Sequence, residues 1–419
     1  MLRIADARHQ GAPVDLLVDG DKILTMTPPG RSPAPEEAEV FEAGGLVLLP
    51  GFIDAHAHLR EPGFEYKEDI ASGLTAAAHG GFSTVMCMAN TNPVNDTAAV
   101  TRFMLERAAQ SHPHGPRLCP IAAATKGLKG EEMAPLAELK AAGCAALSND
   151  GRPVENTELL RRIMEYAADL DMIFIDHCED ARLAKGWVMN EGAVSGLLGV
   201  KGQPDVGEAV QAARDIMLAE YLRLPVHIAH VSAALTLDVI AWGKARGVKV
   251  SAETCPHYLM LDESALEGYN TLAKVSPPLR GAKDRKALRE AVKNGLVDIL
   301  VTDHAPHAAQ EKDDTLDEAP CGITGLDTAL SLTWGLVREG ILDESDPARL
   351  WCRRPGEIFK LPWNGFAPGD PADFFLFDPD ELWMPGPDVM FSKSLNTPFM
   401  GQPLHGRVKA HWIGGKRIL

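Results

Sequence analysis

The segment Gly51-Phe-Ile-Asp-Ala-His-Ala-His58 begins as an apolar run and ends on two histidines. The run at residues 51–55 predicts a buried β-strand. Residues two positions apart in a strand point to the same side, so His56 and His58 can reach one point together. Because neutral imidazole is a common ligand of zinc and similar divalent ions, the segment predicts a strand that carries two metal ligands at its end.

Further β-type runs follow this strand and alternate with helical patterns, in which apolar residues recur at three- and four-residue spacing. This alternation is typical of a parallel sheet covered by helices, and eight units predict an α/β fold of the (β/α)8 TIM-barrel type. A doubly wound open sheet shares the alternation, but the Gly-rich fingerprint of such sheets is missing after the first strand. The predicted strands are residues 51–55, 83–88, 117–122, 145–148, 172–175, 226–229, 248–252 and 299–301, and the predicted helices include 155–170, 204–222, 233–246 and 283–293.

Strand-like runs also occur near both ends of the chain, separated by Gly, Pro and Asp turn signals. They lie at residues 14–18 and 46–49, and again at 373–377 and 408–413. Pairing between these runs predicts a small composite β-sandwich domain, made of residues 1–49 plus 363–419. Residues 50–362 then form the inserted barrel.

The composition excludes several classes of protein. A formal net charge of −17 over 419 residues argues against nucleic-acid binding, which needs clustered lysine and arginine. The seven cysteines are scattered without a C-x-x-C pair, which fits a reducing cytoplasm. The chain shows neither a signal-peptide pattern nor an apolar stretch of about 18 residues, so we expect a cytoplasmic protein without a membrane partner.

Histidines and carboxylates also follow four later strands, at the carboxyl ends where barrel enzymes place their chemistry. Together with the first pair they suit two divalent ions bridged by a carboxylate and by water. Such water becomes a hydroxide nucleophile, and Asp303 is placed to pass its proton to a leaving nitrogen. The six candidate ligands are His56, His58, Asp150, His177, His230 and Asp303.

Two neighbouring side chains are expected to point elsewhere. His227 and His230 are three positions apart and therefore face opposite sides of a regular strand, which predicts a structural role for His227. Cys178 adjoins His177 and is predicted to pack rather than to react.

Polar and cationic residues near the predicted barrel mouth suggest the substrate class. Arg60 can offer a two-pronged hydrogen bond to a carboxylate, and Asn90 and His307 supply further polar groups. Together they outline a pocket for an anion. The polar segment 308–319 is a candidate loop over this mouth.

At this point the chain resembles a known family, the class I dihydroorotases of the amidohydrolase superfamily. The most specific stretches are the H-x-H-L-R-E-P-G run at residues 56–63 and the D-H-A-P-H run at residues 303–307. The likeness extends from Pro50 to the Pro-Gly-Asp-Pro-Ala-Asp segment that ends at Asp373. It implies the reversible cyclisation of N-carbamoyl-L-aspartate to (S)-dihydroorotate plus water, a step of de novo pyrimidine biosynthesis.

The resemblance also implies a zinc centre of one or two ions, with two expected. His56, His58 and Asp303 would hold one ion, His177 and His230 the other, and Asp150 would bridge them. It assigns the substrate carboxylate to Arg60, Asn90 and His307 and the ring amide edge to backbone groups around Cys321 and Gly322. Ser276 stands where the family often has an asparagine that contacts the ring.

Two alternatives stay open beside dihydroorotase. One is an allantoinase- or hydantoinase-like enzyme that acts on another cyclic ureide. Against this alternative, Arg60 favours dihydroorotase. The other is a catalytically silent homologue that serves as a structural partner of aspartate transcarbamoylase, which would be free to lose metal ligands. A homodimer and an association with aspartate transcarbamoylase are the expected assemblies.

Overall fold

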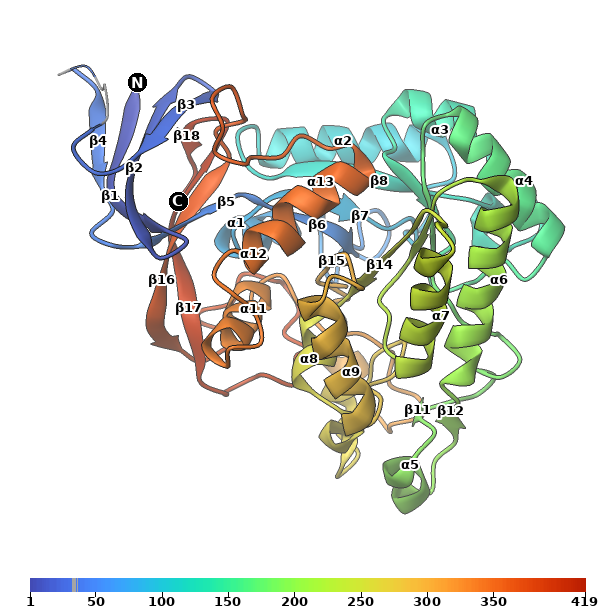
Figure 1. Cartoon of the computed structure of the whole chain (residues 1–419). Helices are drawn as coiled ribbons and strands as arrows, with labels where there is room; N and C mark the ends of the chain where they lie inside the picture. Colours follow the sequence, from blue (N-terminus) through green and yellow to red (C-terminus); the bar gives the residue numbers. More distant parts are fainter. Residues whose placement is uncertain (32–34, 36) are drawn as a thin grey trace.

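Eight parallel strands form the centre of the molecule in the computed structural model, which describes residues 1–31, 35 and 37–419 (Figure 1). Each strand pairs with the next one along the chain, which is the topology of a barrel rather than of a doubly wound sheet. The predicted (β/α)8 class is therefore confirmed. The strands are β6 (Phe52–Ala57), β7 (Phe82–Cys87), β8 (Arg117–Ala123), β9 (Ala146–Ser148), β10 (Phe174–Asp176), β13 (Val226–Ile228), β14 (Val250–Thr254) and β15 (Ile299–Leu300).

The barrel closes between its first and last strands. Ala57 forms a parallel bridge with His304, and the backbone N–H of His58 donates to the carbonyl oxygen of His304 at 2.8 Å. Beneath this bridge the buried carboxylate of Asp54 accepts the backbone N–H of Thr302 at 3.0 Å. Polar groups inside the barrel thus join β6 to the end of β15.

Helices on the outside of the barrel cover the strands. The helix α4 (Thr157–Asp169) begins at Asn156, whose side chain accepts the backbone N–H groups of Glu158 and Leu159. Its apolar stripe, which includes Leu160 and Ile163, is buried. The other long helices are α1 (Ile70–His79), α2 (Ala98–Ser111), α3 (Leu136–Ala142), α6 (Val206–Leu222), α7 (Ala234–Ala245), α9 (Ala282–Lys293) and α11 (Ala329–Arg338).

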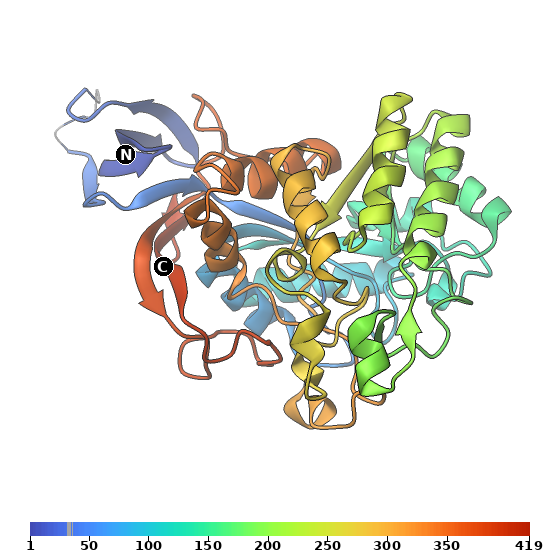
Figure 2. The same cartoon turned by 60° about the horizontal axis from the view of Figure 1, so that its bottom comes forward.

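The two ends of the chain form a second sheet, and both termini lie in it beside the barrel (Figure 1 and Figure 2). The N-terminal β5 pairs with the C-terminal β16, so the composite sheet is observed. The sheet curls around its own core, because residues of β1, β2, β3, β16 and β17 share one apolar cluster. Its strands are β1 (Leu2–His9), β2 (Ala12–Asp19), β3 (Lys22–Thr27), β4 (Glu39–Glu42), β5 (Val47–Pro50), β16 (Phe374–Trp383), β17 (Leu404–Ile413) and β18 (Lys416–Arg417).

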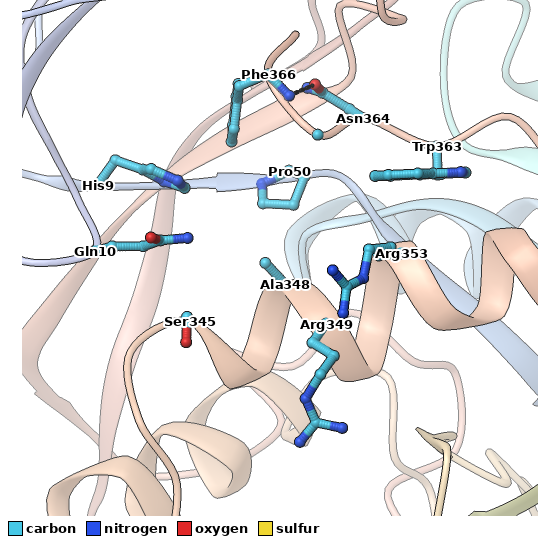
Figure 3. Close-up of a pocket in the computed structure, with 11 residues that line it drawn as sticks. His9, Gln10, Pro50, Ser345, Ala348, Arg349, Arg353, Trp363, Asn364 and Phe366 are labelled. Carbon is cyan, nitrogen blue, oxygen red and sulfur yellow. Dashed lines mark hydrogen bonds between the residues drawn. The ribbon is translucent and has the colours of Figure 1, made fainter. Parts of the chain in front are cut away.

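Polar contacts fix this sheet to the barrel. The buried ring of His411 on β17 lies 2.8 Å from the carbonyl oxygen of Ala78 on α1, and Asp373 pairs with Arg117 at 2.6 Å. A cavity of about 330 Å³ opens at the seam, where His9 and Phe366 face Arg353 and Trp363 (Figure 3). The domain limits of 1–49 plus 363–419 and 50–362 remain our proposal. Among the described residues, no helix is long and apolar enough to cross a membrane.

Candidate active site

A cavity of about 200 Å³ lies at the carboxyl ends of the barrel strands. The residues predicted from widely separated segments meet here, because parallel strands end on the same face of a barrel. His56 is fully buried just beneath the cavity wall. The other predicted site residues line the cavity, namely His58, Arg60, Asn90, Asp150, His177, His230, Ser276, Asp303, His307, Cys321 and Gly322.

Asp150 lies at the centre of the candidate metal ligands. Its Oδ1 atom is 3.5 Å from Nδ1 of His177, 3.3 Å from Nε2 of His230 and 3.6 Å from Nε2 of His56. Its Oδ2 atom is 3.7 Å from Nε2 of His58. One carboxylate therefore faces four imidazoles from three strand ends.

Asp303 faces the first pair of histidines. Its Oδ1 atom is 3.1 Å from Nε2 of His58 and 3.7 Å from Nε2 of His56. Zinc binds nitrogen and oxygen ligands at about 2.0–2.2 Å, which sets neighbouring ligand atoms of a tetrahedral ion about 3.3 Å apart. The separations around Asp150 and Asp303 match that spacing, and Nε2 of His56 is buried without a hydrogen-bond partner among the described residues. The donor set thus fits a divalent metal ion.

The Nδ1 atoms of His56 and His58 contact hydrogen-bond acceptors. Nδ1 of His56 lies 2.7 Å from a carboxylate oxygen of Glu253, and Nδ1 of His58 lies 2.8 Å from the amide oxygen of Asn90. Each acceptor requires a proton on Nδ1, which leaves the Nε2 lone pair directed at the aspartates. Metal-binding histidines are commonly oriented in this way.

Backbone strain coincides with the site. Arg60, His230 and Asp303 have φ angles of 62°, 30° and 43°, in the left-handed region that side chains with a Cβ atom rarely adopt. Such conformations cost about 1–3 kcal/mol each and cluster at functional sites. The strain supports a functional role for these strand ends.

Charge at the centre favours ionised carboxylates. Burial alone would raise the pKa of Asp150, but hydrogen bonds from His177 and His230 hold that pKa well below its usual value. Burial would likewise lower the pKa of His56, but the Glu253 carboxylate outweighs it and raises the pKa to about 9. A metal ion competes with that proton, because only an unprotonated imidazole nitrogen is a ligand.

Arg60 brings a cationic side chain to the cavity. Arg60 donates from Nε to the carbonyl oxygen of Pro306 at 3.1 Å, and its Nη2 atom lies 3.4 Å from the ring of His307. Burial and the charges of Arg60 and Lys67 lower the pKa of His307 to about 2, so this ring is neutral. Its Nε2 contacts the carbonyl oxygen of Cys321 at 2.9 Å. An anion that enters the cavity meets the Arg60 guanidinium.

Some residues near the site were missed by the sequence analysis. Glu253 and His257 are buried, and Lys67 lies 3.3 Å from Nδ1 of His307. Ligand atoms of Cys255, His257 and Asp303 lie within 4.8 Å of one another. Glu253 directly follows the predicted strand at residues 248–252, so the strand-end pattern could have found it, whereas Lys67, Cys255 and His257 lie farther from any predicted strand end.

The side chains expected to point away from the site do so. His227 is buried and contacts Ser251 and Glu253. Cys178, two residues beyond β10, is buried beside Asp215 of α6, and burial raises the pKa of its thiol well above the usual value. Cys178 therefore packs rather than reacts.

The segment 308–319, the candidate loop over the barrel mouth, is hydrogen-bonded to the wall of the cavity. It contains a short helix, α10 (Ala309–Lys312), and the buried Lys312 donates to the backbone carbonyl oxygens of Thr271, Lys274 and Pro320. The N–H of Gly322 also donates to the carbonyl oxygen of Lys274. The carbonyl oxygens of Cys321 and Gly322 already contact His307 and Asn396, so a ring amide could use only the second lone pair of each oxygen.

Solved structures share this architecture over the whole chain. An L-hydantoinase (dihydropyrimidinase) from Arthrobacter aurescens matches 100% of this chain and 95% of its own, with a TM-score of 0.87 at 21% identity. A D-hydantoinase (dihydropyrimidinase) from a Thermus species matches with a TM-score of 0.82 at 22% identity, again over 100% of this chain and 95% of its own. At this identity the likeness concerns the fold. The fold and the cluster of candidate ligands at the barrel mouth together define a TIM-barrel protein with a candidate metal centre.

Sequence relatives narrow the class to one family. A family model described as dihydro-orotase-like matches residues 45–235. A dihydroorotase from Geobacter metallireducens is 46% identical over 406 residues, which are 97% of this chain and 95% of the relative. One from Syntrophus aciditrophicus is 43% identical over 417 residues, which are 99% and 97% of the two chains. The chain belongs to the dihydroorotase family.

Proposed function

We propose that this chain is an active dihydroorotase, which interconverts N-carbamoyl-L-aspartate and (S)-dihydroorotate in de novo pyrimidine biosynthesis. In the cyclisation the ureido nitrogen bonds to the side-chain carboxyl carbon, a C–O bond breaks and water leaves. The observation that carries the proposal is the single cavity in which Arg60 faces the cluster of Asp150, Asp303 and the histidines. That cavity offers an anion contact beside a hydrolytic centre.

We further propose that the cluster holds two zinc ions. His56, His58 and Asp303 would hold one, His177 and His230 the other, and Asp150 would contact both. When bound, such ions polarise a carbonyl group and lower the pKa of water. The ligand spacing and the unpartnered Nε2 of His56 support this assignment.

Asp303 is the residue to which we assign proton transfer. Its contacts with His56 and His58 run through Oδ1, so Oδ2 is the oxygen we assign to carry the proton between water and the ring nitrogen. Burial would raise the pKa of Asp303, but the neighbouring imidazoles of His58, His56 and His230 outweigh burial and keep that pKa below its usual value. Asp303 is then ionised in the resting site and able to accept a proton.

Substrate orientation follows from the cationic side of the cavity. Arg60 would bind the carboxylate retained in both substrate and product, with the amide N–H₂ of Asn90 and the ring of His307 beside it. Ser276 would face the ring edge with a hydroxyl in place of the usual amide. Its shorter reach favours a water molecule between side chain and ring.

A substrate comparison tests the proposal. Purified protein would be incubated with dihydroorotate, hydantoin and allantoin, and ring opening followed by absorbance. We expect turnover of dihydroorotate, which carries the carboxylate that Arg60 can bind. Turnover of hydantoin or allantoin alone would favour the other cyclic amidohydrolase reading, and no turnover after zinc loading would favour the silent homologue.

The silent-homologue reading is disfavoured by the ligand set. Six candidate ligands are present and come together at one strand-end face, although a silent copy is free to lose them. Assembly as a homodimer, or with aspartate transcarbamoylase, stays a prediction that light scattering of the purified proteins would test. All seven cysteines are free, which supports our proposal of a cytoplasmic location.

A further inference from the structure

A buried carboxylate, that of Glu253, contacts the candidate metal ligands from the barrel interior. Glu253 lies on β14, and its side chain is fully buried inside the barrel. Its Oε1 atom is 2.7 Å from Nδ1 of His56 on β6, although β15 separates these two strands in the sheet. Its Oε2 atom is 2.9 Å from Nε2 of His227 on β13. Glu253 therefore spans the barrel interior between two histidines.

The contacts define where the protons lie. Because Nε2 of His56 faces Asp150 and Asp303, Nδ1 carries the proton and donates to Glu253. The Nε2–H of His227 donates to the other oxygen of the same carboxylate, while Nδ1 of His227 accepts from the hydroxyl of Ser251 at 2.7 Å. Both carboxylate oxygens are thus satisfied, as a buried charge requires.

The two histidines of the first strand have unlike partners. The neutral amide of Asn90 accepts from His58, whereas the charged carboxylate of Glu253 accepts from His56. A carboxylate behind an imidazole fixes the ring and makes its far nitrogen a stronger donor to a metal. The backbone N–H of His230 also lies 3.3 Å from Oε1 of Glu253, so one side chain contacts candidate ligands on two strand ends.

We propose that Glu253 is the positioning residue of the metal centre, and that His227 holds Glu253 in place. The carboxylate fixes the orientation of His56 and strengthens its bond to the metal ion. This inference rests on the proposed function, because it assumes that the cluster binds zinc. It assigns to Glu253 and His227 a role in metal affinity rather than only in folding.

Zinc affinity is the measurement that tests this role. Metal-free wild-type protein and Glu253→Gln would be titrated with Zn²⁺ against a chromophoric chelator, and unfolding followed in the absence of metal. We expect Glu253→Gln to weaken one of the bound zinc equivalents about 10–100-fold, which is typical for the loss of such a partner, and to leave the other equivalent nearly unchanged. His227→Gln should weaken the same equivalent less, since Glu253 still contacts His56.

Asp298→Asn is the matched control. Asp298 is another buried carboxylate, bonded to Lys244, Arg354 and the N–H of Ala252 at the opposite end of the strands. Its loss should lower the stability of the metal-free protein without changing zinc affinity. Zinc binding by Glu253→Gln equal to that of the wild type would overturn the inference and leave the proposed function intact.

Further outcomes separate the two proposals. If Glu253→Gln does not fold, His227→Gln decides in its place, and unchanged zinc affinity in that variant overturns the inference. A wild-type protein that binds no zinc would overturn the proposed metal centre itself. Equal losses of zinc affinity in Glu253→Gln and Asp298→Asn would show a general effect of folding and would also overturn the inference.

Discussion

The amide oxygen of Asn90 lies 2.8 Å from Nδ1 of His58, although the two residues follow different strands. Because Nε2 of His58 faces Asp303, its Nδ1 carries the proton, and the amide of Asn90 must present its oxygen to it. The N–H₂ group of Asn90 is then left for the cavity. One side chain therefore connects a candidate metal ligand to the candidate substrate site.

Replacing Asn90 should affect both functions. We expect Asn90→Ala to raise KM for dihydroorotate and to lower zinc affinity, each by about two- to tenfold, since a hydrogen bond of this kind is worth about 0.5–1.5 kcal/mol. Steady-state kinetics and zinc titration measure the two effects. Thr91→Val is the control, because the Thr91 hydroxyl donates to the carbonyl oxygen of Pro93. Equal behaviour of the two variants would contradict the double role of Asn90.

Arg60→Lys should impair carboxylate binding. Lysine keeps the charge but loses the planar fork, so we expect KM for dihydroorotate to rise about 10–100-fold, as for the loss of hydrogen bonds to a charged group. Arg107→Lys, which changes an arginine that pairs with Glu61 outside the cavity, should leave KM unchanged. An unaltered KM in Arg60→Lys would place the substrate carboxylate elsewhere.

Asp303→Asn removes the proposed proton carrier. General acid–base catalysis contributes about 10²–10⁴-fold, so kcat should fall by at least that range. Metal content is measured on the same sample, because Asp303 is also a candidate ligand. A rate equal to that of the wild type would refute the role assigned to Asp303.

Metal removal should inactivate and destabilise the protein. We expect dialysis against a chelator to abolish turnover, and free Zn²⁺ at a hundred times its Kd to restore about 2.7 kcal/mol of stability for each bound ion. Mg²⁺, which prefers oxygen ligands, should not replace it at a histidine-rich site. Turnover that survives complete metal removal would exclude the proposed metal centre.

The buried ring of His411 should make the contact between the terminal sheet and the barrel sensitive to acid. Burial lowers its pKa from 6.5 to about 4, so the unfolded chain binds a proton before the folded one does. The contribution of the neutral ring to the free energy of unfolding is therefore complete above pH 6.5. It is lost as pH falls toward 4, and the loss is about 2 kcal/mol at pH 5. Urea unfolding at pH 7 and pH 5 should show a smaller loss in His411→Phe than in the wild type. Equal losses would assign the acid sensitivity to other groups, such as His79, whose pKa burial also lowers to about 4.

Local patterns in the sequence determined the elements of this fold and the ends at which its chemistry lies. Each predicted barrel strand overlaps an observed one, from β6 to β15, because burial on both faces leaves continuous apolar runs. The terminal strands β1, β3, β4 and β18 were not predicted from sequence. Since parallel strands end on one face, the sequence also indicated that His56, Asp150 and Asp303 would meet.

Only the tertiary structure decided which side chains contact one another across the barrel. Glu253 and His56 are 197 positions apart, and Asp54 and Thr302 are 248 apart. Periodicity tells which residues share a face of a strand, but a contact through the interior also depends on barrel closure and on side-chain rotamers. The candidate ligands could therefore be read from strand ends, whereas the contact between Glu253 and His56 could be found only in the folded chain.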